Sequence, residues 1–540
     1  MEIGKSDSLK SDCLTFFRQN TLACVLFINI VFAGVFFWVN DIRYGNDDMV
    51  MCWIASGCFL GQPDSHLVFS NFIYGLLLVS FYTLFPAIEW YSMFLIALDV
   101  LAISIVQREI LRLTCSRFIK TIVVFAIVIV EIKLLRSLTF TTTAGILATS
   151  SFILICKRNG KSYFIGVLLF VLAAFVRFSS AMLVGVMFLS FYPIHIYRHG
   201  FSKKEFFALS LCVFLGVAFQ FVDRQYYKLD SGWDYYYETN KARAGINDHV
   251  DVWRIKSDMP DDIIESDIDL LYLYGIRDSV IFNNESLMKL HDIMNKQTCY
   301  NSIPYIRKIK HVPFHLKDYL SYWLAVLPLV IVGLVLEKGN RKRLLLCSIP
   351  VVVLPLITSI VSMELIVKER AFLCAYIPFL VFFYAICLDD IVSSKKQAVW
   401  LGFAIVFSVL PMLRFKAFAK ERNTDKNLNV ANYIQENQFL PLFVEWPFDG
   451  NVMSVSKDYY DLSSNGWTYN MPGRNQIDKF TDLVYDEKLV IVGNNNNDEF
   501  FKLLEETICF HYGVHVQPFV LKEIGDIVIY KLIEINDGTF

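Results

Sequence analysis

The sequence predicts a polytopic α-helical membrane protein that carries a small α/β domain at its C-terminal end. Of the 540 residues, 55% are hydrophobic and only 19% are charged, whereas a soluble protein has about 25% charged residues. The apolar residues gather in blocks of about 17 to 25 residues, the length of a helix that crosses a bilayer. Because only the location of charges is informative in such a chain, the net charge of −2 indicates nothing about partners.

Apolar blocks of spanning length begin close to the N-terminus. The first, 21–39, is too long for the apolar part of a cleaved signal peptide and lacks a small-residue cleavage pattern. We therefore predict a cytoplasmic N-terminus at 1–20 and a transmembrane domain over 21–413. The other blocks are 67–85, 91–106, 119–135, 141–156, 162–176, 180–197, 205–222, 317–336, 344–361, 371–388 and 397–413.

The second block is predicted to lie at the membrane surface and not to cross. If all the blocks crossed, the basic loop 107–120 would lie on the outer face, although cytoplasmic loops carry the excess of Lys and Arg. Block 67–85 contains Asn71 and Gly75 and is followed by Pro86 and Trp90, which suits an interfacial helix. Without it, the basic segments share one side; these are the N-terminus, 107–120, 156–162, 197–204, 337–343 and 393–396. This arrangement predicts about 11 transmembrane helices plus a juxtamembrane helix, with outer loops 40–90 and 223–316.

The C-terminal region, 414–540, is predicted to form a small α/β domain on the outer face. Its segment Lys488–Gly493 reads as a buried strand, and Asp498–Gly513 has the spacing of an amphipathic helix. Val516–Leu532 reads as a hairpin that turns near Gly525.

Several kinds of site are not predicted. The twelve cysteines are scattered, mostly within apolar blocks, and show neither a CxxC motif nor a Cys/His ligand spacing. The sequence also lacks a Walker loop, an HExxH motif and a GxSxG motif. We expect no metal site, no cofactor and no disulfide framework.

An acidic pair, Asp47 and Asp48, follows the first span within a few residues. Asn46 is a natural N-cap, and acids in a first helical turn complement the helix dipole, so the pair fits the start of a short interfacial helix. Alternatively, one carboxylate is a general base, because partial burial at a water–membrane boundary raises a carboxyl pKa. The two roles are compatible, with one acid capping the helix and the other acting in catalysis.

Basic residues stand at the predicted outer ends of several spans. An ionisable group at membrane depth is costly and indicates a functional site, and several cations on one face suit a phosphate or diphosphate. The alternatives for each residue are snorkelling to the interface or pairing with Glu131, Glu364 or Glu369. The residues are Lys133, Arg136, Arg177, Lys368 and Arg370.

The outer segment Ser231–Trp253 interleaves aromatic and polar residues. Such a surface can bind a sugar, since aromatic rings stack on the apolar faces of pyranoses. The alternative is an ordinary aromatic belt at the membrane interface. The candidate residues for sugar or acceptor binding are His66, Trp233, Asn240, Arg243 and Asp248.

Three segments, Asn46–Tyr91, Leu138–Gly145 and Tyr237–His249, carry a resemblance to a known family. Together with the acid-bearing first outer loop and the outer C-terminal domain, they give a layout that resembles the GT-C superfamily of membrane glycosyltransferases. More closely, the segments are similar to bacterial membrane proteins related to the phage-type glucosyltransferases that decorate O-antigen. The C-terminal domain shows no resemblance of its own.

The resemblance implies an inverting glycosyltransferase in the cytoplasmic (inner) membrane. Its donor would be a sugar on a polyprenyl phosphate, and its acceptor a surface polysaccharide or a lipid-linked glycan at the outer face. Membrane lipid is an expected partner, and nucleic acid is not. In that family the first-loop acid is the base, which corresponds here to Asp47 or Asp48. The basic residues expected to bind the donor phosphate match those of the family by their position relative to the membrane, and not by a strict motif.

Two other classes of protein remain open. A polysaccharide polymerase or ligase has a similar number of spans and one large outer loop, but relies on basic outer loops. A transporter or flippase has polar residues at mid-membrane, broken helices and two related halves. Here the acids within spans are Asp99 and Glu131, and no internal repeat is found.

Overall fold

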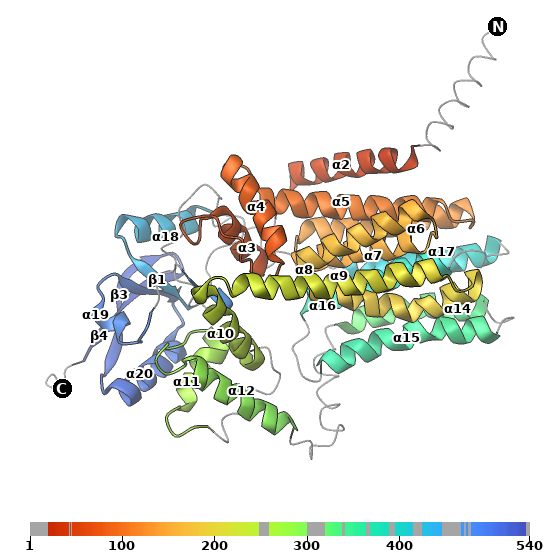
Figure 1. Cartoon of the computed structure of the whole chain (residues 1–540). Coiled ribbons are helices and arrows are strands. Elements are labelled where there is room, and N and C mark those ends of the chain that lie inside the picture. The colour runs from red at the N-terminus through yellow and green to blue at the C-terminus, as the bar shows by residue number, and fades with distance from the viewer. Residues whose placement is uncertain are drawn as a thin grey trace, which may run out of the picture.

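The computed structural model describes residues 20–40, 42, 44, 46–247, 259–299, 319–336, 341–362, 368–387, 395–413, 424–444, 466–468, 471–472 and 477–535. A long helical bundle carries a small sheet-containing domain at one end (Figure 1). The predicted class, a helical membrane bundle followed by a small C-terminal α/β domain, is confirmed.

The helices of the bundle follow the predicted apolar blocks. By length and composition, five described segments are long and apolar enough to cross a membrane: Thr21–Val39, Gly160–His199, Lys203–Tyr227, Glu369–Cys387 and Lys396–Leu413. The helices are α2 (Thr21–Val39), α5 (Trp90–Leu111), α6 (Arg117–Arg136), α7 (Phe140–Ile155), α8 (Gly160–His199), α9 (Lys203–Tyr227), α14 (Leu320–Leu336), α15 (Arg341–Ser362), α16 (Glu369–Phe382), which continues as η4 (Phe383–Cys387), and α17 (Lys395–Val409), which continues as η5 (Leu410–Leu413).

Helix α8 is a hairpin of two arms that turns at Arg177, whose backbone is extended (φ −161°, ψ 106°). The rings of Phe170 and Phe188 both pack on Phe152, with centroid distances of 5.5 Å and 4.7 Å. In a straight helix these two residues would lie about 27 Å apart, so the arms must run antiparallel. With this hairpin, each of the eleven predicted spans coincides with a helix or with one arm of α8.

The acidic segment forms α3 (Asn46–Ser56), and the second apolar block forms α4 (Phe72–Leu84), near one end of the bundle (Figure 1). Helix α4 has 13 residues and is therefore about 20 Å long, too short for a hydrocarbon core of about 30 Å. Its start is tied to α9, because the Phe72 backbone N–H donates to Asp223 at 2.7 Å. Gly75 permits close packing, since a Cβ there would lie 2.1 Å from the Ser65 carbonyl oxygen. The short length of α4 supports the prediction that this block does not cross the membrane.

The predicted basic loops meet at one end of the bundle. Lys157 pairs with Glu109 at 2.9 Å, which joins segment 156–162 to loop 107–120. Arg158 pairs with Glu205 at 2.8 Å and donates to the carbonyl of His199, which adds segment 197–204. We call this the basic end. The acid-bearing helix α3 and the sheet domain lie at the opposite end (Figure 1).

The C-terminal domain is built on a four-stranded sheet with the order β1-β2-β4-β3. The pair β1–β2 is parallel and the other two pairs are antiparallel, with β3 and β4 joined at Gly525 in the left-handed conformation (φ 69°). The predicted strand, helix and hairpin are all present. The elements are α18 (Thr424–Glu436), β1 (Leu440–Phe443), η6 (Gly466–Thr468), α19 (Asp482–Tyr485), β2 (Leu489–Asn494), α20 (Asp498–Tyr512), β3 (Val516–Ile524) and β4 (Ile527–Glu534).

Segment 223–316, predicted to be the large outer loop and called so below, is largely helical where it is described, and it packs on the sheet domain. It forms α10 (Ser231–Asn247), α11 (Glu265–Asp269), η2 (Leu270–Tyr274) and α12 (Asn284–Cys299). Leu270 and Ile276 belong to the same hydrophobic core as the sheet and α20. Buried Asp278 reinforces this packing by accepting from the Phe480 N–H at 2.8 Å and from the Tyr512 hydroxyl at 2.7 Å. The loop and the C-terminal region therefore form one folded unit.

Candidate active site

The two predicted catalytic acids lie in the first turn of α3 but point to different surroundings. Successive residues of a helix are rotated by about 100°, so adjacent carboxylates cannot share one face. Asp48 is fully buried, whereas the Asp47 side chain is 13% exposed. The structure thus gives the two acids different partners and different access.

Asp48 fastens α3 to two helices of the bundle. Its Oδ1 accepts from the Tyr91 hydroxyl of α5 at 2.9 Å and from the Phe140 N–H, at the start of α7, at 2.7 Å. Its Oδ2 has no hydrogen-bond partner among the described residues. Burial raises the pKa of Asp48 to about 7, although the hydrogen bonds from Phe140 and Tyr91 act to lower it.

Asp47 joins three distant parts of the sequence. Its Oδ2 forms an ion pair with Arg370, in the first turn of α16, and its Oδ1 accepts from the Trp467 indole N–H at 3.1 Å. Trp467 belongs to η6 of the C-terminal domain, and its backbone carbonyl accepts from the Tyr236 hydroxyl of α10. Trp467 is not predicted from the sequence, because its short segment shows no motif or periodicity.

A second guanidinium lies beside this pair. Arg177, at the turn of α8, has its guanidinium carbon 4.6 Å from the centroid of the Phe140 ring, and Arg370 lies 5.9 Å from the same centroid. Arg177 Nε donates to Ser179 at 3.1 Å, while its Nη1 is buried without a hydrogen-bond partner among the described residues. Two of the five predicted phosphate-binding cations are therefore brought together next to Asp47.

The other three predicted cations lie at nearby helix ends with different surroundings. Lys133 pairs with Glu369 at 2.9 Å, and Glu369 also accepts from the Tyr322 hydroxyl at 3.1 Å. Pairing with Glu369 was one of the alternatives left open by the sequence. Lys368 is exposed at the N-cap of α16, and Arg136 ends α6.

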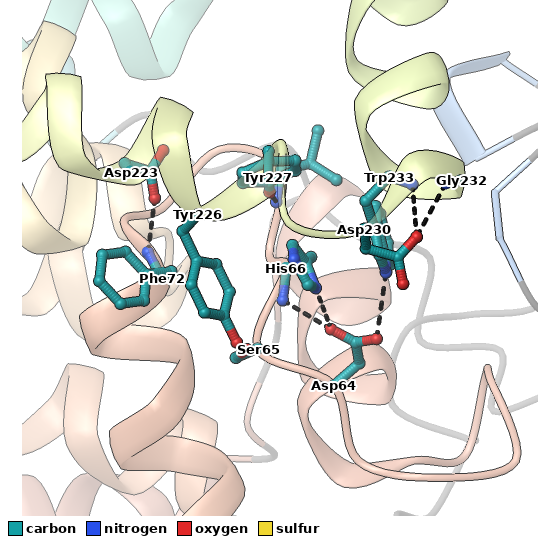
Figure 2. A network of polar contacts seen from close by, with 11 residues as sticks. Asp64, Ser65, His66, Phe72, Asp223, Tyr226, Tyr227, Asp230, Gly232 and Trp233 are labelled. Atoms are coloured by element: carbon teal, nitrogen blue, oxygen red, sulfur yellow. Dashed lines mark hydrogen bonds and ion pairs between the residues drawn. The ribbon is translucent and has the colours of Figure 1, made fainter.

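His66 and Trp233 meet in a buried network between the α3–α4 connection and α10 (Figure 2). The His66 ring stacks between Tyr226 and Trp233, with centroid distances of 4.9 Å and 4.6 Å. Asp64 lies 2.6 Å from His66 Nδ1 and accepts from the Trp233 indole N–H at 3.3 Å. Burial acts to raise the pKa of Asp64, but the hydrogen bonds from His66 and Trp233 outweigh it and leave the pKa below its ordinary value.

The predicted sugar-binding residues do not form one surface in the described structure. Trp233 is only 2% exposed, and His66 covers one face of its ring, so its burial weighs against direct stacking on a sugar. Arg243 donates to Asn240 at 3.0 Å along α10. Asp248 lies outside the described residues. Their role in binding an acceptor stays a prediction.

Two groups of described residues could hold a metal ion, and neither includes Asp47 or Asp48. Cys156, His195 and Glu205 gather at the basic end, where Glu205 also pairs with Arg158. Glu505, Cys509 and His515 gather on the sheet domain. The first group shows no ligand spacing in the sequence, because its members come from three separate segments.

No family model and no curated protein matches the chain. Among solved structures, the chain is similar to the crystal structure of ArnT from Cupriavidus metallidurans in the apo state, with 11% sequence identity and a TM-score of 0.40. The match covers 97% of this chain and 98% of that chain.

Proposed function

We propose that the chain is a membrane glycosyltransferase of the GT-C type. It would transfer a sugar from a polyprenyl-phosphate donor to a surface glycan or lipid-linked acceptor, at the outer face of the cytoplasmic membrane. The observation that carries the proposal is the contact of Asp47 with Arg370, with Arg177 beside it, at the end of the bundle opposite the basic loops. A carboxylate next to two guanidinium groups offers a base for the acceptor and a site for the leaving phosphate.

Asp47 is the better candidate for the base. Its carboxylate retains access to solvent, and it lies against the cation that would hold the donor. Asp48 is fully buried, and its Oδ1 already accepts two hydrogen bonds. We assign Asp48 a positioning role, in which it fixes α3 on α5 and α7 and thereby sets the location of Asp47.

Arg177 and Arg370 are the proposed phosphate ligands. A guanidinium presents a planar set of N–H donors that matches phosphate oxygens. The partnerless Nη1 of Arg177 supplies one such donor. Arg370 would exchange part of its ion pair with Asp47 for the donor phosphate, which would leave the carboxylate free to accept a proton.

An apolar groove offers a site for the polyprenyl chain. It lies between the first arm of α8 and α9, has a volume of about 880 Å³, and is lined almost entirely by apolar side chains. The groove extends from Lys203, at the basic end, to Phe219. Phe219 packs on Phe175 at a centroid distance of 4.8 Å, two residues before Arg177. A lipid tail in this groove would therefore end near the proposed phosphate site.

The reaction follows from this arrangement. The acceptor hydroxyl gives its proton to Asp47 while its oxygen forms a bond to the anomeric carbon. The bond between that carbon and the phosphate oxygen breaks, and its electron pair leaves with the phosphate, whose charge Arg177 and Arg370 stabilise. In-line displacement inverts the anomeric configuration. The outer loop and the C-terminal domain, which contributes Trp467, would line the entry of the acceptor.

The mass of the cell-surface glycan repeat tests this function. Cells with the gene, without it, and with Asp47→Asn would be compared, with the amount of protein checked by immunoblot. Loss of one sugar mass per repeat in the null and the variant is the expected result. An unchanged repeat mass with shortened chains would instead indicate a polymerase or ligase. No change in either property would reject both classes and favour a transporter.

A further inference from the structure

Three side chains that can bind a metal ion meet at the basic end of the bundle, opposite α3 and the candidate active site. Cys156 is the C-cap of α7, His195 lies near the C-terminal end of α8, and Glu205 lies in the first turn of α9. The Cys156 sulfur, one ring nitrogen of His195 and one carboxylate oxygen of Glu205 all lie within 4.8 Å of one another. Thiolate, imidazole and carboxylate are the side-chain groups that bind zinc in proteins.

The separations of these atoms suit a single ion. Zinc lies about 2.0–2.3 Å from its ligand atoms, which in a tetrahedral site are therefore about 3.3–3.6 Å apart. His195 Nε2 and Glu205 Oε1 are already 3.1 Å apart. The remaining separations are those of the Cys156 sulfur, and they exceed the zinc value by about 1 Å at most. Because Cys156 is partly exposed, its side chain has room to rotate by that amount.

Two of the three ligand atoms are buried without a hydrogen bond. His195 is 4% exposed and Glu205 is 0% exposed. Although His195 Nε2 and Glu205 Oε1 lie close together, they lack the alignment of a hydrogen bond, and neither has another hydrogen-bond partner among the described residues. Buried polar atoms without partners are rare in folded proteins, because burial costs them their hydration. An ion bound to both atoms would satisfy them.

Arg158 holds two of the ligand-bearing segments in place. Its Nε donates to the other carboxylate oxygen of Glu205, Oε2, at 2.8 Å. Its guanidinium also donates to the carbonyls of His199 and Gly200, between α8 and α9. Carboxylates that bind a metal commonly accept such an additional hydrogen bond, which orients them. Because Arg158 binds Oε2, the Oε1 atom stays available to an ion.

We propose that Cys156, His195 and Glu205 bind a zinc ion at the basic end of the bundle. This differs from the expectation of no metal site, which the sequence gives because the ligands come from three separate segments. The thiolate and the carboxylate balance the charge of one Zn²⁺, and the thiol proton is released to solvent on binding. Three protein ligands leave a fourth position for water. The ion would tie the end of α7 to α8 and α9, and the proposal does not depend on the transferase reaction.

The second Cys/His/Glu group, on the sheet domain, provides a matched control. There His515 Nδ1 lies 2.9 Å from Glu505 Oε1, and His515 Nε2 lies 3.6 Å from the Cys509 sulfur, both as hydrogen bonds. These atoms therefore have partners in one another, and the His515 side chain is 49% exposed. We expect zinc to bind less tightly at this group than at Cys156.

Metal content and Co²⁺ absorption test the site in the full chain, purified in detergent micelles and freed of any affinity tag. The protein should retain one zinc ion per chain, and Co²⁺ in its place should give the charge-transfer absorption of a Co²⁺–thiolate bond. Cys156→Ser should remove this absorption, whereas Cys509→Ser should match the wild type. His195→Gln should weaken Zn²⁺ binding by about 100-fold or more, since loss of an outer partner alone costs about 10–100-fold.

Alkylation of Cys156 gives a measurement that needs no substitution and so does not depend on whether a variant folds. After removal of metal by a chelator, iodoacetamide should label this partly exposed thiol. Added Zn²⁺ should slow the labelling by about tenfold or more, because the thiolate that reacts is also the metal ligand. The rate at Cys509, read from peptide masses in the same sample, should change less.

Two results would overturn the proposal. The first is a wild-type protein that retains no zinc, gives no thiolate absorption with Co²⁺ and shows no protection of Cys156 by Zn²⁺. The 3.1 Å contact would then be an ion pair between protonated His195 and Glu205. The second is a thiolate absorption that persists in Cys156→Ser and disappears in Cys509→Ser, which would place the ion on the sheet domain.

Discussion

Trp467 donates its indole N–H to Asp47 across 420 residues of sequence, at a distance of 3.1 Å. The contact links the C-terminal domain directly to the first turn of α3. The ring of Trp467 also packs edge-on against Phe69, at 4.7 Å between centroids. The C-terminal domain therefore contributes a residue to the candidate active site.

We predict that Trp467→Phe lowers transfer without unfolding the protein. The substitution keeps an aromatic ring against Phe69 but removes the N–H that orients Asp47, and loss of one hydrogen bond to a charged group costs about 1.5–3 kcal/mol. The fraction of glycan repeats that carry the extra sugar measures the effect. Trp38→Phe is the control, because Trp38 is 91% exposed on α2. Wild-type transfer in Trp467→Phe would show that the contact is only structural.

The two adjacent acids should respond differently to the same substitution. Asp47→Asn is expected to reduce transfer by roughly 10²–10⁴-fold, the contribution of a general base. Asp48→Asn keeps a carbonyl oxygen that can accept from Phe140 and Tyr91, so we expect a smaller loss. Both would be measured by the mass of the glycan repeats at equal protein amounts. If Asp48→Asn is the more damaging change, Asp48 is the base and our assignment is reversed.

The membrane part of the fold was predictable because its patterns are local. Arg177 separates two apolar blocks, and the chain turns at this residue. The positions of Asp47, Arg177 and Arg370 predict that all three lie at the same end of the spans, and the structure brings them together. The lengths of the apolar blocks and the positions of the charges predict this arrangement, since they determine how deep in the membrane, and on which side of it, a residue lies.

Contacts between distant segments were not predictable from a single sequence. Nothing around Trp467 indicates that it reaches Asp47, and nothing around Asp278 indicates that it joins the outer loop to the sheet domain. Aromatic composition also does not reveal burial. It suggested a sugar-binding surface around Trp233, which the structure places in a packed network with His66.

Arg370 and Arg177 should not tolerate replacement by Lys. Lysine keeps the charge but loses the planar set of donors that fits a phosphate, so Arg370→Lys is expected to reduce transfer by roughly 10²–10³-fold, as for loss of one donor to a transition-state oxyanion. Binding of polyprenyl phosphate in nanodiscs, followed by native mass spectrometry, would show the matching loss of donor affinity. Arg117→Lys, an exposed change on α6 near the basic end, is the control. If Arg370→Lys and Arg177→Lys both leave donor binding unchanged, the donor phosphate binds at another place in the protein.

The Asp64–His66 pair should make stability depend on pH in a defined direction. The pKa of Asp64 is lowered in the folded protein, so its ionised form contributes stability above the unfolded pKa of about 3.9. That contribution is lost as the pH falls through the folded pKa. We expect Asp64→Asn to lower the unfolding temperature at pH 7 and to converge on the wild type in acid below pH of about 4. Asp261→Asn, at an exposed position, should show no such convergence. A constant difference at every pH would contradict the lowered pKa.

Removal of the C-terminal domain should destabilise the outer loop and not only the site. Leu270 and Ile276, from the loop, are buried in a core that the sheet and α20 complete. Truncation at about residue 414 would expose both side chains, at about 25 cal/mol for each Å² of apolar surface, and would leave Asp278 without the Phe480 N–H and the Tyr512 hydroxyl. We expect the truncated chain to insert but to aggregate on purification. Limited proteolysis would then cut within 265–282, a segment that we expect to be protected in the full chain.

The control is Tyr512→Phe, which keeps the domain and removes one hydrogen bond to Asp278. If the truncated chain is soluble in micelles and its outer loop resists protease, the loop folds without the domain and the two are separate units.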